Sequence, residues 1–221
     1  FSGNDSAGNT GTAQVTNVTY DPDAPTASIV YDPTGRPYRN GETVRITAKF
    51  NEDMANSPAP QIEIAGPDTA SVGATNMTYV SATEYYYDYA VPTQNGTGTI
   101  SLRTGTDLAG NVITTIPTGG TGTFTVDNTS PTMTITSTTS GVSDGSTTND
   151  ASIALTFTSS EATTNFIAND ITVTGGTLGT LTPDSSTVYK ATFTPTGSGS
   201  TNVTQATTID VAGGVFTDAA G

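Results

Sequence analysis

Cysteine and histidine are both absent from the 221 residues of this chain. Without cysteine the protein has neither a disulfide framework nor a thiolate zinc site, and without histidine it lacks the commonest general base and metal ligand. The sequence also contains no G-x-S-x-G turn that would position a nucleophilic serine. We therefore expect a protein that is not an enzyme.

Charge and long apolar runs are scarce as well. Charged residues make up 12% of the chain, and the formal net charge is −14. This acidic balance disfavours nucleic acid and anionic membranes as partners and favours cations as ligands. No apolar stretch approaches the ~18 to 20 residues of a membrane span, so membrane insertion is not expected. Because extracellular proteins of this size often use disulfides, another stabilising device is to be sought.

What the chain does contain is an internal repeat. The phrase VTYDPDAPTASIVYD at residues 18–32 aligns with FTVDNTSPTMTITS at residues 124–137, which places Asp21 with Asp127 and Pro25 with Pro131. Each repeat offers about seven short alternating segments, separated by Gly, Pro, Asn and Asp, and no helical period. This pattern predicts an all-β chain of tandem antiparallel β-sandwiches.

Several motifs in order carry a family resemblance. The second repeat contains FTSSE, DITVTGGTL and FTDAAG, and the first contains FNEDM, DLAGN and FTVDNTSPT. The chain thus resembles the bacterial immunoglobulin-like (Ig-like) tandem repeats of large surface adhesins. The resemblance implies an Ig-like fold and an extracellular location, at the bacterial cell surface or secreted.

An Asp-x-Ala-Gly phrase occurs at residues 4–9, 106–111 and 217–221. In the family that the chain resembles, this loop precedes the last strand of each sandwich. The resemblance therefore implies three units. Residues 1–22 would be the closing loop and last strand of a preceding or neighbouring-chain domain, residues 23–128 a first Ig-like domain, and residues 129–221 a second one that lacks its last strand.

Two explanations fit this offset. Either the segment is cut from a longer array without regard to domain edges, or residues 10–20 complete the second sandwich of a neighbouring molecule by donor-strand exchange. Self-completion is disfavoured, because the linker at residues 21–25 spans at most about 18 Å. Donation from chain to chain would not close on itself and would build a filament. Val15 is the residue we expect to enter the acceptor core.

Acidic residues recur at equivalent turns and at the domain junctions. Ca²⁺ takes six to eight oxygen ligands in irregular geometry, so loops rich in Asp, Asn and Gly suit it. Calcium is therefore the expected stabilising device at the joints, although Asp and Asn also cap turns without any metal. The candidate ligands are Asp5, Asp21, Asp23, Glu52, Asp53, Asp107, Asp127, Glu161 and Asp218.

The stretch EYYYDY at residues 84–89 is the second candidate site. Strand alternation places Tyr85, Tyr87 and Tyr89 on one face. Alignment with the second repeat pairs Tyr86 with Tyr189, which predicts that Tyr86 faces the core and that the other three face outward. Such a surface would suit a glycan, another cell surface or a neighbouring subunit, whereas ordinary cross-strand pairing is the alternative explanation.

The sequence as a whole predicts a non-catalytic extracellular spacer module of a repetitive bacterial surface adhesin or filament. Its expected partners are neighbouring repeats or identical subunits. The alternative is an accessory binding module of a secreted carbohydrate-active enzyme.

Overall fold

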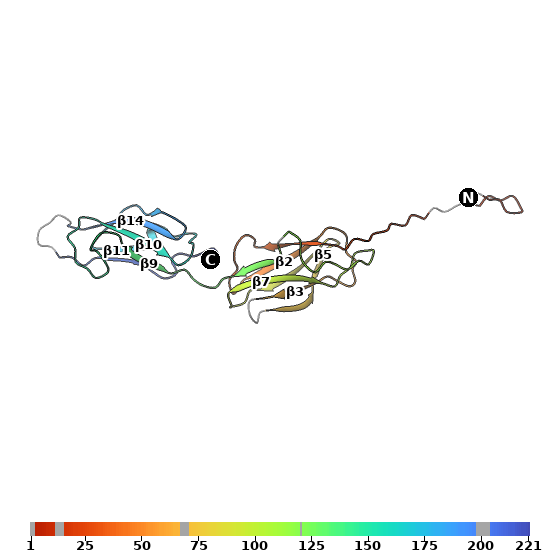
Figure 1. Ribbon diagram of the computed structural model, residues 1–221, viewed down its shortest axis with the longest axis horizontal. Helices are drawn as coiled ribbons and strands as arrows, with labels where there is room; N and C mark the ends of the chain where they lie inside the picture. The colour runs from red at the N-terminus through yellow and green to blue at the C-terminus, as the bar shows by residue number, and fades with distance from the viewer. Residues whose placement is uncertain (1–2, 12–15, 67–70, 120, 198–203) are drawn as a thin grey trace.

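The computed structural model describes residues 3–11, 16–66, 71–119, 121–197 and 204–221. The chain forms two β-sandwiches placed end to end, with an extended N-terminal segment that leads away from the first (Figure 1). The all-β prediction is confirmed. Among the described residues, no helix is long and apolar enough to cross a membrane.

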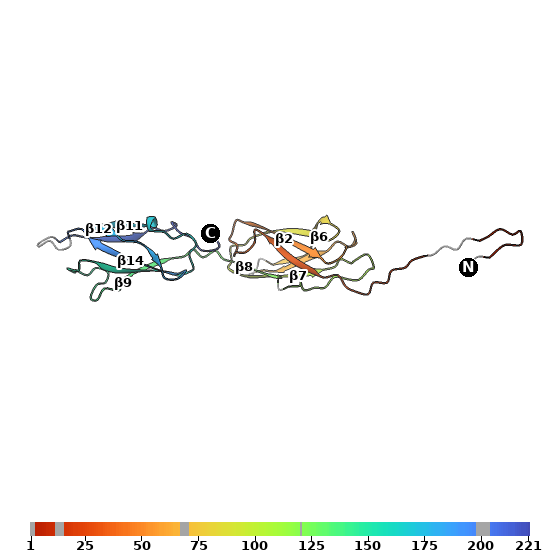
Figure 2. The same cartoon turned by 90° about the horizontal axis from the view of Figure 1, so that it is seen from above.

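The first sandwich consists of two four-stranded antiparallel sheets. One sheet has the order β1 (Ala27–Asp32), β2 (Thr43–Phe50), β6 (Glu84–Ala90) and β5 (Thr78–Ser81). The other has the order β4 (Val72–Asn76), β3 (Gln61–Ala65), β7 (Gly96–Arg103) and β8 (Thr123–Val126). Figure 2 shows the two layers from above.

The second sandwich repeats this plan with a smaller second sheet. Its larger sheet has the order β12 (Gly176–Leu178), β14 (Val188–Pro195), β10 (Ile153–Ser159) and β9 (Met133–Ser137), with β13 (Thr182–Pro183) also paired to β14. Its other sheet contains β11 (Ile171–Thr174) and β15 (Thr208–Val211), preceded by the 3₁₀ turn η1 (Ala168–Asp170). No described strand lies on the outer side of β15, where the first sandwich has β8.

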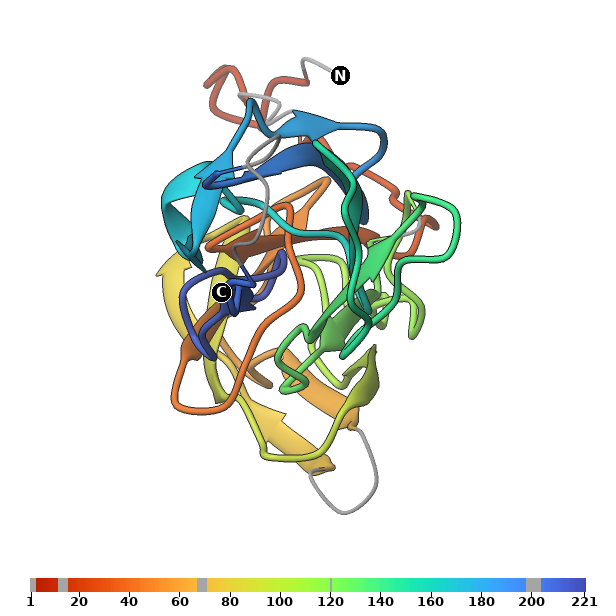
Figure 3. The same ribbon diagram turned by 90° about the vertical axis from the view of Figure 1, so that its left-hand side faces the viewer.

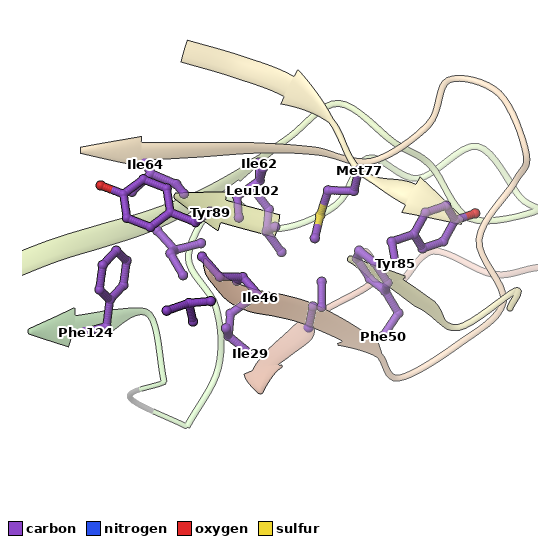
Figure 4. Close-up of a cluster of buried hydrophobic side chains, with 14 of the residues drawn as sticks. Ile29, Ile46, Phe50, Ile62, Ile64, Met77, Tyr85, Tyr89, Leu102 and Phe124 are labelled. Atoms are coloured by element: carbon purple, nitrogen blue, oxygen red, sulfur yellow. The ribbon is translucent and has the colours of Figure 1, made fainter. Parts of the chain in front are cut away.

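Alternation along the strands explains both cores. In β2, Val44, Ile46 and Ala48 are fully buried while the residues between them face outward, as expected for one face of a pleated strand. Figure 4 shows the core of the first sandwich, in which aromatic and aliphatic side chains from both sheets meet. The second core is a separate cluster around Phe157 and Phe193.

The joint between the sandwiches is a short extended segment that begins directly after β8. The backbone N–H of Asn128 donates to Asn95 Oδ1 at 2.7 Å, and Asn95 Nδ2 donates to Thr129 Oγ1 at 2.6 Å. On the far side, the Thr132 N–H donates to Ser160 Oγ at 2.9 Å. The linker is thus held by both sandwiches.

A second contact crosses the joint. Arg36, in the loop after β1, donates from Nη1 to the carbonyl oxygen of Ala220 at 3.2 Å, and Arg39 donates to the carbonyl oxygen of Gly221. Arg36 also forms an ion pair with Glu42 at 2.8 Å. The last residues of the chain therefore lie between the two sandwiches, as Figure 1 shows, and Figure 3 shows the molecule along its long axis.

Candidate metal centres

The Asp-x-Ala-Gly phrase forms a turn capped by its own aspartate at each of its three places, with the same long bond in the first two. The Oδ1 atom of its aspartate accepts a hydrogen bond from the backbone N–H four residues later, at 2.9 Å in the Asp5 loop and 2.8 Å in the Asp107 loop. At Asp218 the same atom accepts from Ala220 and Gly221. The glycine is needed because it has a positive φ in each copy, 86° at Gly8 and 96° at Gly110. The recurrence is therefore explained by local turn chemistry.

Each sandwich adds two further carboxylates to this turn. Around the Asp107 loop of the first sandwich, carboxylate oxygens of Asp21, Glu52 and Asp107 all lie within 4.8 Å of one another. Asp21 precedes β1, Glu52 follows β2, and Asp107 follows β7, so three segments distant in sequence meet at one end of the sandwich. Asp107 is 2% exposed. We call these three residues the first cluster.

Asn111 positions two members of the first cluster. Its Nδ2 donates to Asp107 Oδ2 at 2.8 Å and to the carbonyl oxygen of Asp21 at 3.0 Å. The linker that enters the sandwich is thereby held against the closing loop. Sequence analysis did not single out Asn111, although its place in the repeated phrase was the signal that would have found it.

The second sandwich has an equivalent group. Carboxylate oxygens of Asp127, Glu161 and Asp218 also lie within 4.8 Å of one another. Asp127 directly follows β8 of the first sandwich, whereas Glu161 follows β10 and Asp218 lies in the loop after β15. This second cluster therefore joins the end of one sandwich to two loops of the next.

Burial and the crowding of negative charges in each cluster raise the pKa of its glutamate. Burial raises the pKa of Glu52, and the nearby charges of Asp21 and Asp107 raise it further. Burial likewise raises the pKa of Glu161, together with the charges of Asp127 and Asp218. Each cluster thus holds three carboxylates in a place where their mutual repulsion is unfavourable. A hard divalent cation would relieve that repulsion, and carboxylate oxygens are the ligands it prefers.

The structure brings together six of the nine acidic residues proposed as ligands. Asp5, Asp23 and Asp53 belong to neither cluster. Asp5 instead forms its own turn with Asn9, whose hydrogen bonds lower the pKa of Asp5. Asp23 donates its backbone N–H to Asp21 Oδ1 at 3.1 Å.

The prediction that Tyr85, Tyr87 and Tyr89 face outward is wrong. Tyr85 and Tyr89 are 2% and 3% exposed, and Tyr87 packs against the same core. Figure 4 shows Tyr85 and Tyr89 among the core residues. It is Tyr86 that faces outward, where the Arg45 guanidinium lies 4.0 Å from its ring centre.

The error is a slip of one residue in the alignment of the repeats. Tyr85 lies opposite Ala48 in β2, and Tyr189 lies opposite Phe157 in β10. Since Ala48 and Phe157 occupy the same place, four residues before the cluster glutamates, Tyr189 is the counterpart of Tyr85 and not of Tyr86. A slip of one residue moves every side chain of a strand to the opposite face.

The predicted donor residue, Val15, lies outside the described residues. The part of that segment that is described ends in an extended stretch with two apolar side chains, Val18 and Tyr20, which are 85% and 86% exposed.

Comparison with known proteins agrees with this architecture. Residues 127–221 match the model of a family described as bacterial Ig-like domain. These residues form a bacterial Ig-like domain. The match begins at Asp127 of the second cluster and includes the strands β9 to β15. The family expectation drawn from the sequence is thereby confirmed for this domain.

A solved structure described as FdeC, an Escherichia coli adhesin, also resembles the chain, with 14% sequence identity and a TM-score of 0.38. The similarity covers 83% of this chain and 58% of that one. No curated protein gives a significant sequence match.

Proposed function

We propose that this chain is a non-catalytic structural spacer of a repetitive bacterial surface adhesin or filament, located outside the cell, whose joints are stiffened by Ca²⁺ at the two clusters. The observation that carries the proposal is the place of the clusters. Each one joins the residue before a sandwich to two loops of that sandwich, so a bound ion would connect consecutive units. Stiff joints keep the units of a spacer in line and so increase its end-to-end length.

The burial of each cluster supports a metal over solvated surface charge. Asp107 and Asp218 are 2% and 8% exposed, and each is accompanied by a glutamate whose pKa is raised by burial and by its acidic neighbours. Without a cation, folding must bring these carboxylates together against their repulsion. With one, three carboxylate oxygens per cluster, one from each residue, lie close enough together to share the ion. Ca²⁺ tolerates irregular geometry and would complete its six to eight oxygen ligands with backbone carbonyls and water.

The alternative function is an accessory binding module of a secreted carbohydrate-active enzyme. An outward face of Tyr85, Tyr87 and Tyr89 would have favoured a glycan contact, but Tyr85 and Tyr89 are buried in the core. Head-to-tail assembly of copies through the N-terminal segment is the remaining part of the proposal, and its partners are identical subunits or neighbouring repeats.

Thermal unfolding in millimolar Ca²⁺ and in EDTA tests the calcium sites. Because an ion that binds only the folded state stabilises it by mass action, about 2.7 kcal/mol at one hundred times the Kd, chelation should lower the Tm by several degrees. Glu52→Gln should weaken the response of the first sandwich and Glu161→Gln that of the second. Asp53→Asn, next to Glu52 but outside the cluster, is the matched control and should leave both responses intact. Identical melting curves in the two buffers would refute the calcium proposal.

A further inference from the structure

The second sheet of the second sandwich is smaller than its counterpart: among the described residues, no strand lies beside β11 where the first sandwich has β4, or beside β15 where it has β8. In the first sandwich β7 pairs on one side with β3 and on the other with β8. In the second, β15 pairs with β11, and no described residue pairs with its other edge. A strand edge with unpaired N–H and C=O groups is a template for another strand.

The core next to this edge is correspondingly less covered. Ile64 of β3 and Ile100 of β7 lie opposite each other and are 0% and 2% exposed. Their counterparts in β11 and β15, Val173 and Ile209, also lie opposite each other but are only partly buried. Among the described residues, no strand takes the place in the second sandwich that β8 fills in the first.

What β8 supplies is two side chains. Phe124 and Val126 are 6% and 1% exposed, and the Phe124 ring contacts the rings of Tyr38 and Tyr89 at centroid distances of 6.1 and 5.3 Å. Three residues after Phe124 comes Asp127, the first ligand of the next cluster. A strand that completes the second sandwich therefore needs two apolar residues at alternate positions, the second of them directly before an aspartate.

The N-terminal segment has this pattern. Val18 and Tyr20 precede Asp21 at the same spacing, and both are more than four-fifths exposed in an extended stretch that no described strand pairs with. Asp21 then enters the first cluster, just as Asp127 enters the second. The junction that follows each pair has the same construction, so a strand donated by a second copy would continue into a joint of the kind already present within the chain.

We infer that residues 17–20 of one copy of this chain pair with residues 205–208 of a second copy, the stretch that leads into β15, with Val18 opposite Thr207 and Tyr20 opposite Gln205. This inference rests on the proposed head-to-tail assembly. The register follows from the first sandwich, in which Phe124 lies opposite Gly98, two residues before Ile100. Thr207 stands two residues before Ile209, the counterpart of Ile100, and so takes the place of Gly98.

The side chains on the two strands are matched in size. A Cβ at Gly98 would lie 2.2 Å from the ring of Phe124, so a phenylalanine on the closing strand requires a glycine opposite it. In the second sandwich the larger Thr207 occupies that place, and the residue that would face it is the smaller Val18. The exchange of Gly and Phe for Thr and Val keeps the packing volume of the pair similar, as volume-conserving swaps in cores do.

Disulfide trapping tests the register, because the chain has no cysteine of its own. Facing residues of antiparallel strands have Cα atoms about 4.5 to 5.5 Å apart, within the range that a disulfide spans. The two chains to be mixed carry Val18→Cys and Thr207→Cys, at about 0.15 M salt to screen the repulsion between copies of net charge −14. The matched control replaces Val18→Cys by Thr19→Cys, whose side chain points to the opposite face.

Under mild oxidation the Val18→Cys and Thr207→Cys mixture should give a covalent dimer on non-reducing electrophoresis, at least tenfold more abundant than in the control. Both substituted residues are exposed, so the variants are expected to fold. Equal amounts of dimer in both mixtures, or monomers in both, would overturn the inference. If the monomers still show the calcium-dependent Tm, strand donation fails while the spacer function with calcium at its joints stands.

Discussion

The two sandwiches share one plan, yet among the described residues the first has a strand at the position of β8 and the second has none. The inward-facing isoleucine and leucine side chains of β3 and β7 are at most 2% exposed, whereas their counterparts Val173, Ile209 and Val211 on β11 and β15 are only partly buried. The difference lies in β8, which adds a strand to the sheet and two side chains to the core. The comparison indicates that β8, although it is the edge strand of its sheet, contributes two side chains that cover the core.

The acidic clusters, unlike the cores, are the same in the two sandwiches. Both consist of two aspartates and one glutamate, and both have oxygen atoms within 4.8 Å of one another, although the described part of the chain has a closing strand in the first sandwich alone. Their residues come from the linker, the end of the second strand and the loop of the repeated phrase. The cluster is therefore formed at the end of the sandwich opposite to the part of the core that β8 covers.

Removal of the Phe124 ring tests the role of the closing strand most directly. Phe124→Ala leaves a cavity among Tyr31, Tyr38 and Tyr89, so we expect the first sandwich to lose about 3 to 5 kcal/mol of unfolding free energy. Urea unfolding followed by tyrosine fluorescence measures this. Val18→Ala, at the equivalent exposed position, is the control and should change the stability of the monomer by less than about 0.5 kcal/mol. A loss of less than about 1 kcal/mol for Phe124→Ala would mean that the closing strand does not seal the core.

The residue that faces the closing strand gives a second matched pair. Gly98→Ala would place its Cβ against three atoms of the Phe124 ring at 2.2 to 2.7 Å, so we expect a cost of about 2 to 3 kcal/mol from overpacking. Thr207→Ala, at the equivalent position of the second sandwich, removes an exposed side chain and should cost less than about 0.5 kcal/mol in the monomer. Similar losses for both variants would show that β15 is covered in solution.

Much of this architecture follows from the sequence in physical terms. Strand alternation and the internal repeat predict two sandwiches, and the equivalent positions of Asp21 and Asp127, or of Asp107 and Asp218, bring the cluster residues to the same loops. The facing of the tyrosines could not be obtained in this way, because the alignment was anchored on a proline after the strand and the two strands differ there by one residue. Only the pairing of Tyr85 with Ala48 fixes the register.

A comparison of Asn111 with Asn9 tests whether the asparagine of the repeated phrase stabilises the cluster or only its own turn. Asn111→Ala removes hydrogen bonds to Asp107 and to the linker at Asp21, and a bond to a carboxylate in this part-buried place is worth about 1.5 kcal/mol. We expect a loss of that size in the first sandwich, together with weaker calcium stabilisation, by calorimetry with and without EDTA. Asn9→Ala removes the same bond in the exposed N-terminal loop and should not affect either sandwich. Equal effects of the two variants would contradict a positioning role for Asn111.

The smallest expected effect compares two equivalent tyrosines. The hydroxyl group of Tyr85 is buried and has no hydrogen-bond partner among the described residues, whereas that of Tyr189 is hydrogen bonded to Thr163 Oγ1. Because an unpaired buried hydroxyl group is unfavourable, Tyr85→Phe should leave the first sandwich unchanged or stabilise it by up to about 1 kcal/mol. Tyr189→Phe removes a satisfied hydroxyl group and should destabilise the second sandwich by about 1 kcal/mol. Urea unfolding of the two variants measures the difference in sign, and a destabilised Tyr85→Phe variant would show that this hydroxyl group binds water or a partner in solution.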